Sequence, residues 1–163
     1  MSKLSDPMRG VLEGRYYAML ATLNDGGSIH MTPVWYLFED NCLFVSSSSM
    51  SRKVKNVTSR PEVSLMVDVR KLGSEKWVYA SGTAEIIKGE ESKSINAKIR
   101  QRYVTKAGLE DSRVGPVFEA GNDITIKITP KTWRSWDMKS LDDQLFGGIL
   151  SQTPETWFLP LEG

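Results

Sequence analysis

The sequence has few of the residues from which disulfides and metal sites are built. Its 163 residues include one cysteine, Cys42, and one histidine, His30. A single cysteine cannot form an internal disulfide, and a lone histidine cannot supply the usual His-rich metal site. Because no histidine lies near Cys42 in the sequence, we interpret it as a buried structural thiol. We therefore predict neither a disulfide nor a metal site.

Long apolar runs and a strong net charge are also absent. No run approaches the roughly 20 residues that a bilayer-spanning helix needs, and the first ten residues lack the apolar core of a signal peptide. The formal net charge is +1, so no overall field attracts nucleic acid or an anionic membrane. We expect a cytoplasmic protein that binds neither of them. A nucleic-acid patch of Arg52, Lys53 and Lys55 is the rival interpretation.

The chain also lacks a glycine-rich dinucleotide fingerprint and any alternation of strands with helices, which argues against a Rossmann domain. It has instead about six short apolar runs, mostly joined by close turns such as Asn24–Gly27 and Glu39–Asn41. Pro33 interrupts one run and indicates an edge, a bulge or a bend. Short antiparallel strands with close turns favour a small closed barrel. The expected strands cover residues 16–23, 28–38, 42–46, 62–68, 77–87 and 123–136.

Three segments have helical character. Asp6 and Pro7 are typical of a helix start, and Gly14 would end that helix. A short helix is expected over 51–58 and a longer one over 89–108. The tail 137–163 contains no clear helix or strand, yet its Trp157 and Phe158 are large and apolar. We expect one domain, 1–163, with a core at about 16–136 and a tail that packs on the barrel or on a partner subunit.

The segment richest in chemical groups follows the third run. Four serines, Ser46–Ser49, precede Ser51, Arg52 and Lys53 at the expected helix start. Free N–H groups at a helix N-terminus attract an anion, and hydroxyls and cations can complete its cage. We interpret the segment as the phosphate end of a cofactor site. An ordinary serine loop beside a solvated helix face is the alternative.

Several motifs in order resemble the FMN-binding split-barrel family, which includes the pyridoxamine 5′-phosphate oxidases and the deazaflavin-dependent reductases. They are ATL-NDGG at 21–27, the strand 31–36, LFVSS at 43–47, SRK at 51–53, the glycine-containing strand 77–87 and ITP…W at 128–136. The resemblance covers roughly Tyr16 to Trp136. It implies a mainly β fold, a six-stranded antiparallel Greek-key split barrel with a few helices. It also implies a homodimer with a flavin in each of two clefts at the subunit interface.

The resemblance also implies which residues hold the cofactor. Arg52 and Lys53 would hold the phosphate, and nearby serines would supply hydroxyls and amides. The strand 31–36 would run beneath the isoalloxazine ring, and two tryptophans would lie near it, from the same subunit or across the interface. The implied cofactor-binding residues are Met31, Thr32, Pro33, Val34, Trp35, Tyr36, Ser46, Ser47, Ser51, Arg52, Lys53, Trp77 and Trp136.

The chain departs from the pattern of true pyridoxamine 5′-phosphate oxidases. Met31 and Tyr36 stand where those enzymes have Arg and Lys, and Trp77 aligns with their Gln. The stretch 142–144, Asp-Asp-Gln, replaces an Arg-Leu-His cluster, and Phe146 lies near a further Arg position. Because the clamp for the substrate phosphate is missing, vitamin B6 oxidation is not expected.

We expect an oxidoreductase that moves a hydride between FMN and a small, conjugated organic molecule. No residue stands out as a catalytic acid or base, and His30 and Tyr36 qualify only if they face the cleft. A deazaflavin coenzyme is the close alternative, with Lys53, Lys55 and Arg60 near its acidic tail. The complete Ser51-Arg52-Lys53 match favours FMN. A non-catalytic flavin- or haem-binding protein, with His30 as axial ligand, is the further alternative.

Overall fold

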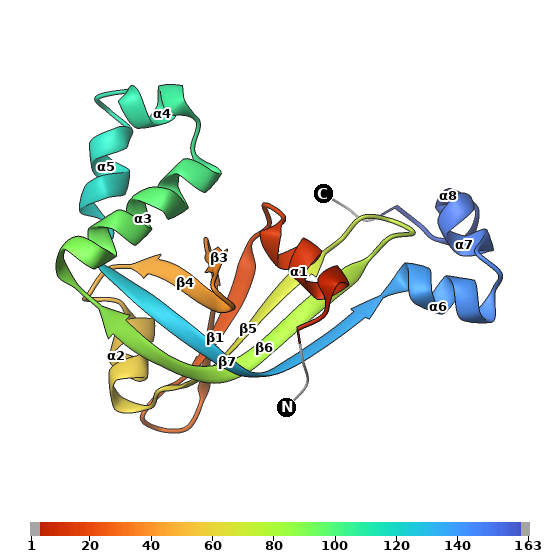
Figure 1. Ribbon diagram of the computed structural model, residues 1–163, viewed down its shortest axis with the longest axis horizontal. Coiled ribbons are helices and arrows are strands. Elements are labelled where there is room, and N and C mark those ends of the chain that lie inside the picture. Colours follow the sequence, from red (N-terminus) through yellow and green to blue (C-terminus); the bar gives the residue numbers. More distant parts are fainter. Residues whose placement is uncertain (1–3, 161–163) are drawn as a thin grey trace.

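The fold is one antiparallel sheet that curls into a half-barrel, with helices at its ends and edges (Figure 1). This computed structural model describes residues 4–160. The sheet has seven strands in the order β2-β1-β5-β6-β7-β4-β3. This confirms a mainly β split barrel, with seven strands in place of the expected six. The strands are β1 (Ala18–Leu23), β2 (Ile29–Val34), β3 (Leu37–Glu39), β4 (Cys42–Ser47), β5 (Glu62–Val69), β6 (Lys76–Ile87) and β7 (Ile124–Asp137).

The extra strand arises because the expected run 28–38 divides after Val34. Its first part, β2, forms one edge of the sheet, and β3 forms the opposite edge. Trp35 and Tyr36 connect the two edges, and no ladder joins β2 to β3. The barrel is therefore split and not closed. Pro33 lies in the edge strand β2, where its missing N–H leaves no central ladder incomplete.

Turn residues set the register of the sheet. Asp40 and Asn41, with φ of 50° and 59°, form the tight connection between β3 and β4. Gly82 lies at a bulge between β6 and β7. A Cβ added at Gly82 would lie 2.1 Å from the carbonyl oxygen of Thr129, so no other residue fits without a backbone shift.

The core lies between the concave face of the sheet and helix α1 (Asp6–Glu13). Alternate residues of each strand point inward, including Leu20, Leu65, Val78 and Ile126, and Leu12 of α1 packs with them. The expected start of α1 is confirmed with Pro7 in its first turn, although its N-cap is Ser5 and not Asp6.

The expected helix 89–108 is shorter in the structure. It ends at Tyr103 as α3 (Gly89–Tyr103), and α4 (Lys106–Glu110) begins separately. The break has a local cause, because the Thr105 hydroxyl accepts a 3.1 Å bond from the Gly108 N–H and so caps a new helix. A further short helix, α5 (Gly115–Ala120), follows with Pro116 in its first turn.

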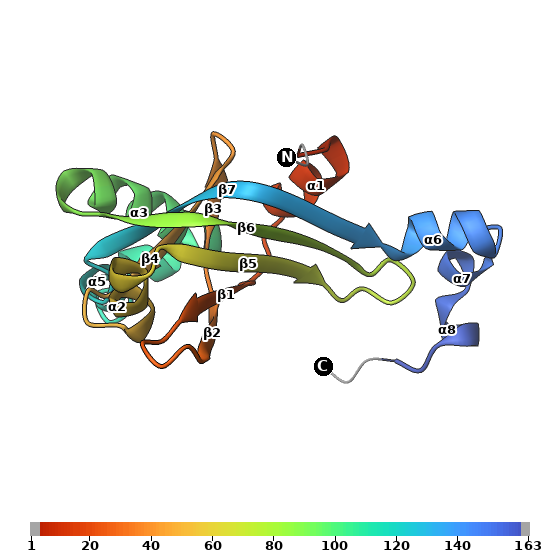
Figure 2. The same cartoon turned by 90° about the horizontal axis from the view of Figure 1, so that it is seen from below.

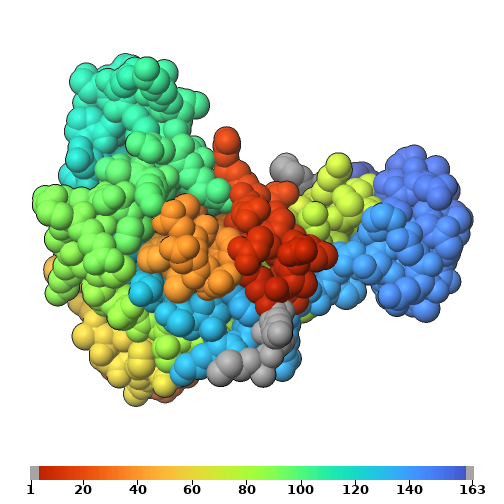
Figure 3. Space-filling view, in the orientation of Figure 1, coloured from red at the N-terminus to blue at the C-terminus, as the bar shows by residue number. Residues whose placement is uncertain are grey.

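The expectation that the tail lacks regular structure is wrong. It contains α6 (Met138–Leu145), α7 (Ile149–Gln152) and α8 (Pro154–Trp157), and its last three residues lie outside the described range. These helices stand beyond the far end of β6 and β7 (Figure 2) and form a separate lobe in the space-filling view (Figure 3). Within residues 4–160, no helix has the length and apolar character to cross a membrane.

Candidate functional site

The loop between β4 and α2 (Arg52–Ser59) has a fixed shape. The hydroxyl groups of Ser47 and Ser51 lie 2.9 Å apart, and the Ser51 N–H donates to the carbonyl of Ser48. The Ser49 N–H donates a 2.6 Å bond to Asp123 at the start of β7. Because the loop is tied at these points, the backbone at the start of α2 is held in place.

At the start of α2, the backbone N–H groups are not capped by any side chain of the described residues. Ser51 is the N-cap, with extended backbone angles, but its side chain makes no capping bond. The first N–H groups of the helix are therefore available to an anion, as the positive end of a helix dipole favours.

Two cations lie at this helix start, and neither forms an ion pair or hydrogen bond with another residue of the described range 4–160. Arg52 is exposed, whereas Lys53 is half-buried. Burial lowers the pKa of the Lys53 ammonium below the usual lysine value, because desolvation disfavours its charged form. A half-buried ammonium without a carboxylate is a favourable place for an external anion.

Buried contacts anchor α2 to the β1–β2 hairpin. The Asn56 amide donates 3.0 Å bonds to the Thr22 hydroxyl and to the Asn24 side-chain oxygen. The Arg60 guanidinium donates to the carbonyls of Asn24 and Asp25. Arg60 therefore holds the turn between β1 and β2. Lys55, by contrast, is exposed and borders a 760 Å³ hollow beside α2.

Strand β2 places the expected ring-binding residues on two faces. Met31 and Pro33 are exposed on the outer face. Val34 is buried, and the Thr32 hydroxyl is buried without a hydrogen-bond partner in residues 4–160. His30 is half-buried two residues earlier. An unsatisfied buried hydroxyl has a desolvation cost that a ligand group could relieve.

Tyr36 lies beyond the strand and inside the core. It is fully buried, and its hydroxyl donates to the Leu12 carbonyl at 2.9 Å. Burial and the neighbouring Tyr103 raise the pKa of Tyr36 well above its usual value. Its side chain therefore does not face a cleft, and the condition for its catalytic role is not met. Trp35 stacks on Tyr103 with ring centroids 5.1 Å apart.

Trp77 and Trp136 are cross-strand partners on β6 and β7, far from α2. Ala84 of β6 borders the hollow beside α2. At about 3.3 Å per strand residue, Trp77 lies roughly 20 Å along β6 from that point. One protomer therefore does not bring the tryptophans and the start of α2 around one small ligand.

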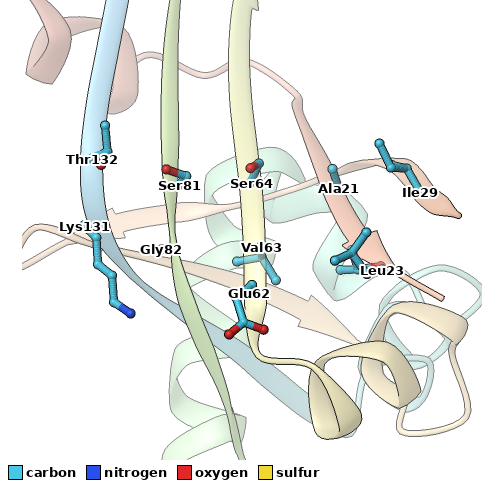
Figure 4. A pocket seen from close by; sticks show the side chains of 11 residues that line it. Ala21, Leu23, Ile29, Glu62, Val63, Ser64, Ser81, Gly82, Lys131 and Thr132 are labelled. Carbon is cyan, nitrogen blue, oxygen red and sulfur yellow. The ribbon is translucent and has the colours of Figure 1, made fainter. Parts of the chain in front are cut away.

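The outer face of the sheet carries two adjoining hollows that the sequence did not reveal. One, of 420 Å³, extends over β1, β2, β5, β6 and β7 (Figure 4). The other, of 400 Å³, includes Trp77 and Arg134, and both are lined by Ser81 and Thr132. In Figure 4, Glu62 and Lys131 extend toward the same end of the first hollow. The glycine of the expected strand 77–87, Gly82, lines the first hollow.

Within residues 4–160, no three His, Cys, Asp or Glu side chains are grouped in a way that could hold a metal ion.

Comparisons with known proteins agree on the fold. A conserved hypothetical protein from Mycobacterium tuberculosis matches with 20% identity and a TM-score of 0.72, over 100% of this chain and 93% of that chain. A coenzyme factor 420 reductase has 17% identity and a TM-score of 0.62, over 77% and 94%. The haem storage protein of Vibrio cholerae has 16% identity and a TM-score of 0.60, over 83% and 94%.

A search of curated protein sequences found no match. A sequence model of the pyridoxamine 5′-phosphate oxidase family, however, matches residues 4–137, which include the whole sheet and the serine loop. The chain therefore belongs to the pyridoxamine 5′-phosphate oxidase family of FMN-binding split-barrel proteins.

Proposed function

We propose that this protein binds FMN, with the phosphate at the start of α2, and is an oxidoreductase acting on a small conjugated organic molecule. The observation that carries the proposal is the half-buried Lys53, which lies beside Arg52 without an acidic partner in the described range. A dianionic phosphate would supply the negative charge that Lys53 lacks, and it would accept hydrogen bonds from the free N–H groups at the helix start. The unpartnered Thr32 hydroxyl on β2 is a second group that fits a bound ligand.

In this proposal the flavin supplies the hydride chemistry when bound, and the protein supplies binding, orientation and exclusion of water. Arg52, Lys53 and the serines Ser46, Ser47 and Ser51 hold the phosphate. Backbone groups of β2, from Met31 to Val34, face the edge of the ring, since β2 has a neighbouring strand on one side only. Trp35 and Tyr36 support the end of this strand through the contacts with Tyr103 and Leu12.

We also propose a homodimer that forms through the outer face of the sheet. This face is apolar at several exposed positions, including Met31 at 56% and Trp136 at 36% exposure. Trp77 and Trp136 of one protomer would then approach the cofactor of the other. Trp77 lies roughly 20 Å along β6 from the end of the strand beside α2. This distance supports the arrangement, because the two tryptophans cannot reach the phosphate site of their own protomer.

Pyridoxamine 5′-phosphate is not the proposed substrate. Where the true oxidases have an Arg-Leu-His cluster, this chain has Asp142, which is fully buried. Its carboxylate accepts bonds from Leu150 and Ser151 within the tail. A buried carboxylate engaged in this way offers no cation to a substrate phosphate.

A deazaflavin coenzyme is the second candidate, and the hollow beside α2 is the observation in its favour. This hollow of 760 Å³ starts near the serine loop at Ser49 and is bordered by Lys55 and Lys88. Two lysines along a groove suit an acidic chain that continues from the phosphate.

The absorbance spectrum of the purified protein, before and after addition of FMN or the deazaflavin coenzyme, tests the proposal. A flavin band that follows the protein through gel filtration is the expected result, and a deazaflavin band would establish the second candidate. A Soret band would instead favour a haem protein with His30 as the axial ligand, and replacement of His30 would test that role. Absence of any bound chromophore after both additions would contradict the proposal.

A further inference from the structure

The three helices of the tail form one internally fastened unit. The buried carboxylate of Asp142 in α6 accepts a 3.0 Å bond from the Leu150 N–H. It also accepts bonds of 2.7 Å and 2.6 Å from the N–H and hydroxyl of Ser151 in α7. The Trp157 indole of α8 donates to the Ile149 carbonyl at 3.2 Å. Polar groups thus point into the unit and hold its shape.

Large apolar side chains of this unit face outward. Leu145, Trp157 and Leu159 are 66%, 52% and 88% exposed, and Phe146 and Ile149 are exposed beside them. We call these five residues the apolar patch of the tail, because large apolar side chains exposed together on one small ordered unit mark an interaction site. The patch adjoins the outer face of the sheet, because the exposed Trp136 is followed directly by Asp137, the N-cap of α6.

The barrel of the same protomer does not cover this patch. The tail contacts its own barrel at the β5–β6 turn, where the Met138 N–H donates a 2.8 Å bond to the Glu75 carbonyl. At the same turn, a Cβ on Gly73 would lie 2.7 Å from the Pro154 side chain. In Figure 2 the three tail helices stand beyond the end of the sheet, away from the body of the barrel.

The charge of the tail indicates what would cover it. Residues 137–163 contain five acidic residues and one lysine, so this segment has a formal charge of −4. Because the whole chain has a formal net charge of +1, residues 1–136 have a charge of +5. On the outer face of the sheet, Lys131 and Arg134 form no ion pair or hydrogen bond with another residue in the described range. Within the tail, Asp142 is buried and Asp143 pairs with Lys139 at 2.7 Å, whereas Glu155 is exposed and forms no ion pair in the described range. The apolar tail with its free Glu155 therefore complements the basic outer face of another copy of the chain.

We propose that the tail is an exchanged arm: α6–α8 of each protomer dock on the outer face of a second copy, beside its Lys131 and Arg134. This proposal rests on the proposed homodimer and adds the segment that fastens it. Reciprocal exchange would cover the apolar patches of both tails at once and form a self-complementary contact.

Isotope-mixed crosslinking tests the exchange. Unlabelled and ¹⁵N-labelled protein are denatured together and refolded, and native mass spectrometry verifies that mixed dimers form. A carbodiimide then couples carboxylates directly to lysine amines. We expect crosslinks from Glu155 to Lys131, with mixed-isotope pairs about as abundant as same-isotope pairs. Tail-to-barrel bonds in same-isotope pairs alone, or no such bonds at all, would overturn the proposal.

Paired variants separate the arm from the flavin site. Leu145→Ser with Leu159→Ser should raise the dimer dissociation constant by about tenfold or more, because both side chains lose apolar contact. The control is Gln144→Ser with Gln152→Ser, which changes exposed polar positions in α6 and α7 and should leave dimerisation unchanged. A dimer equally stable in both variants would refute the arm. FMN binding is measured separately on the dimeric wild type. Failure to bind FMN in a dimer that still depends on the tail would contradict the proposed function and leave the arm intact.

Discussion

The side-chain amide of Asn56 donates a 3.0 Å hydrogen bond to the hydroxyl of Thr22, and both residues are buried. This bond joins the middle of α2 to the end of β1. It therefore links the helix that begins with Arg52 and Lys53 to the hairpin that carries the edge strand β2. The proposed phosphate and ring ends of the cofactor site are held in one rigid frame by this contact.

The Asn56→Ala variant should lose both stability and cofactor affinity. It leaves the Thr22 hydroxyl without its donor and the Asn24 oxygen unpaired, at a cost of about 1–3 kcal/mol in the free energy of unfolding. Urea denaturation measures this loss, and titration with FMN measures the second effect. Thr58→Ala is a suitable control, since that hydroxyl donates only to the Val54 carbonyl within the same helix. Equal stability of Asn56→Ala and wild type would show that the link does not position α2.

Tyr36→Phe separates a core role from a catalytic one. Removal of the hydroxyl leaves the Leu12 carbonyl without its 2.9 Å donor, so stability should fall by about 1–2 kcal/mol. Cofactor affinity and turnover, corrected for the folded fraction, should not change. A variant that folds normally but loses turnover would mean that Tyr36 acts in catalysis despite its burial.

Lys53 should make cofactor binding depend on pH. Its pKa is lowered in the folded protein, so above that pKa the folded chain holds fewer protons than the unfolded chain. The cost of burying the charge is then relieved as pH rises toward the ordinary lysine value, and stability of the cofactor-free protein increases. Phosphate binding has the opposite trend, because the anion favours the protonated ammonium and loses it as pH rises through the lowered pKa.

Lys53→Arg provides the comparison, because arginine keeps its charge throughout this range. As pH rises toward the ordinary lysine pKa of about 10.4, FMN affinity should decline in the wild type and stay nearly level in the variant. Parallel declines in the two proteins would assign the pH dependence to some other group.

Local patterns in the sequence were sufficient to predict the hairpin turns and the position of α2. Asn24–Gly27 and Glu39–Asn41 form the expected hairpins. The helix expected over 51–58 is α2, which covers Arg52–Ser59. The interruption after Val34 could not be predicted, because it depends on contacts of Trp35 and Tyr36 with residues distant in sequence, Tyr103 and Leu12.

The tail shows the same limit. Helices of four residues, such as α7 and α8, are too short to be indicated by periodicity. Their position depends on the Asp142 carboxylate and its bonds to residues in another helix. The distance between Trp77 and α2 was likewise invisible in the sequence, because motif order says nothing of position along a long strand.

The most direct test of the central claim is an FMN titration of the wild type, the Arg52→Ala/Lys53→Ala double variant and a Lys55→Ala control. Each charge-assisted bond to the phosphate is worth roughly 1.5–3 kcal/mol, so the double variant should bind FMN at least about 100-fold more weakly. Lys55 is exposed on the same helix, and its variant should bind nearly as the wild type does. Unchanged affinity in the double variant would contradict the assignment of the phosphate to the start of α2.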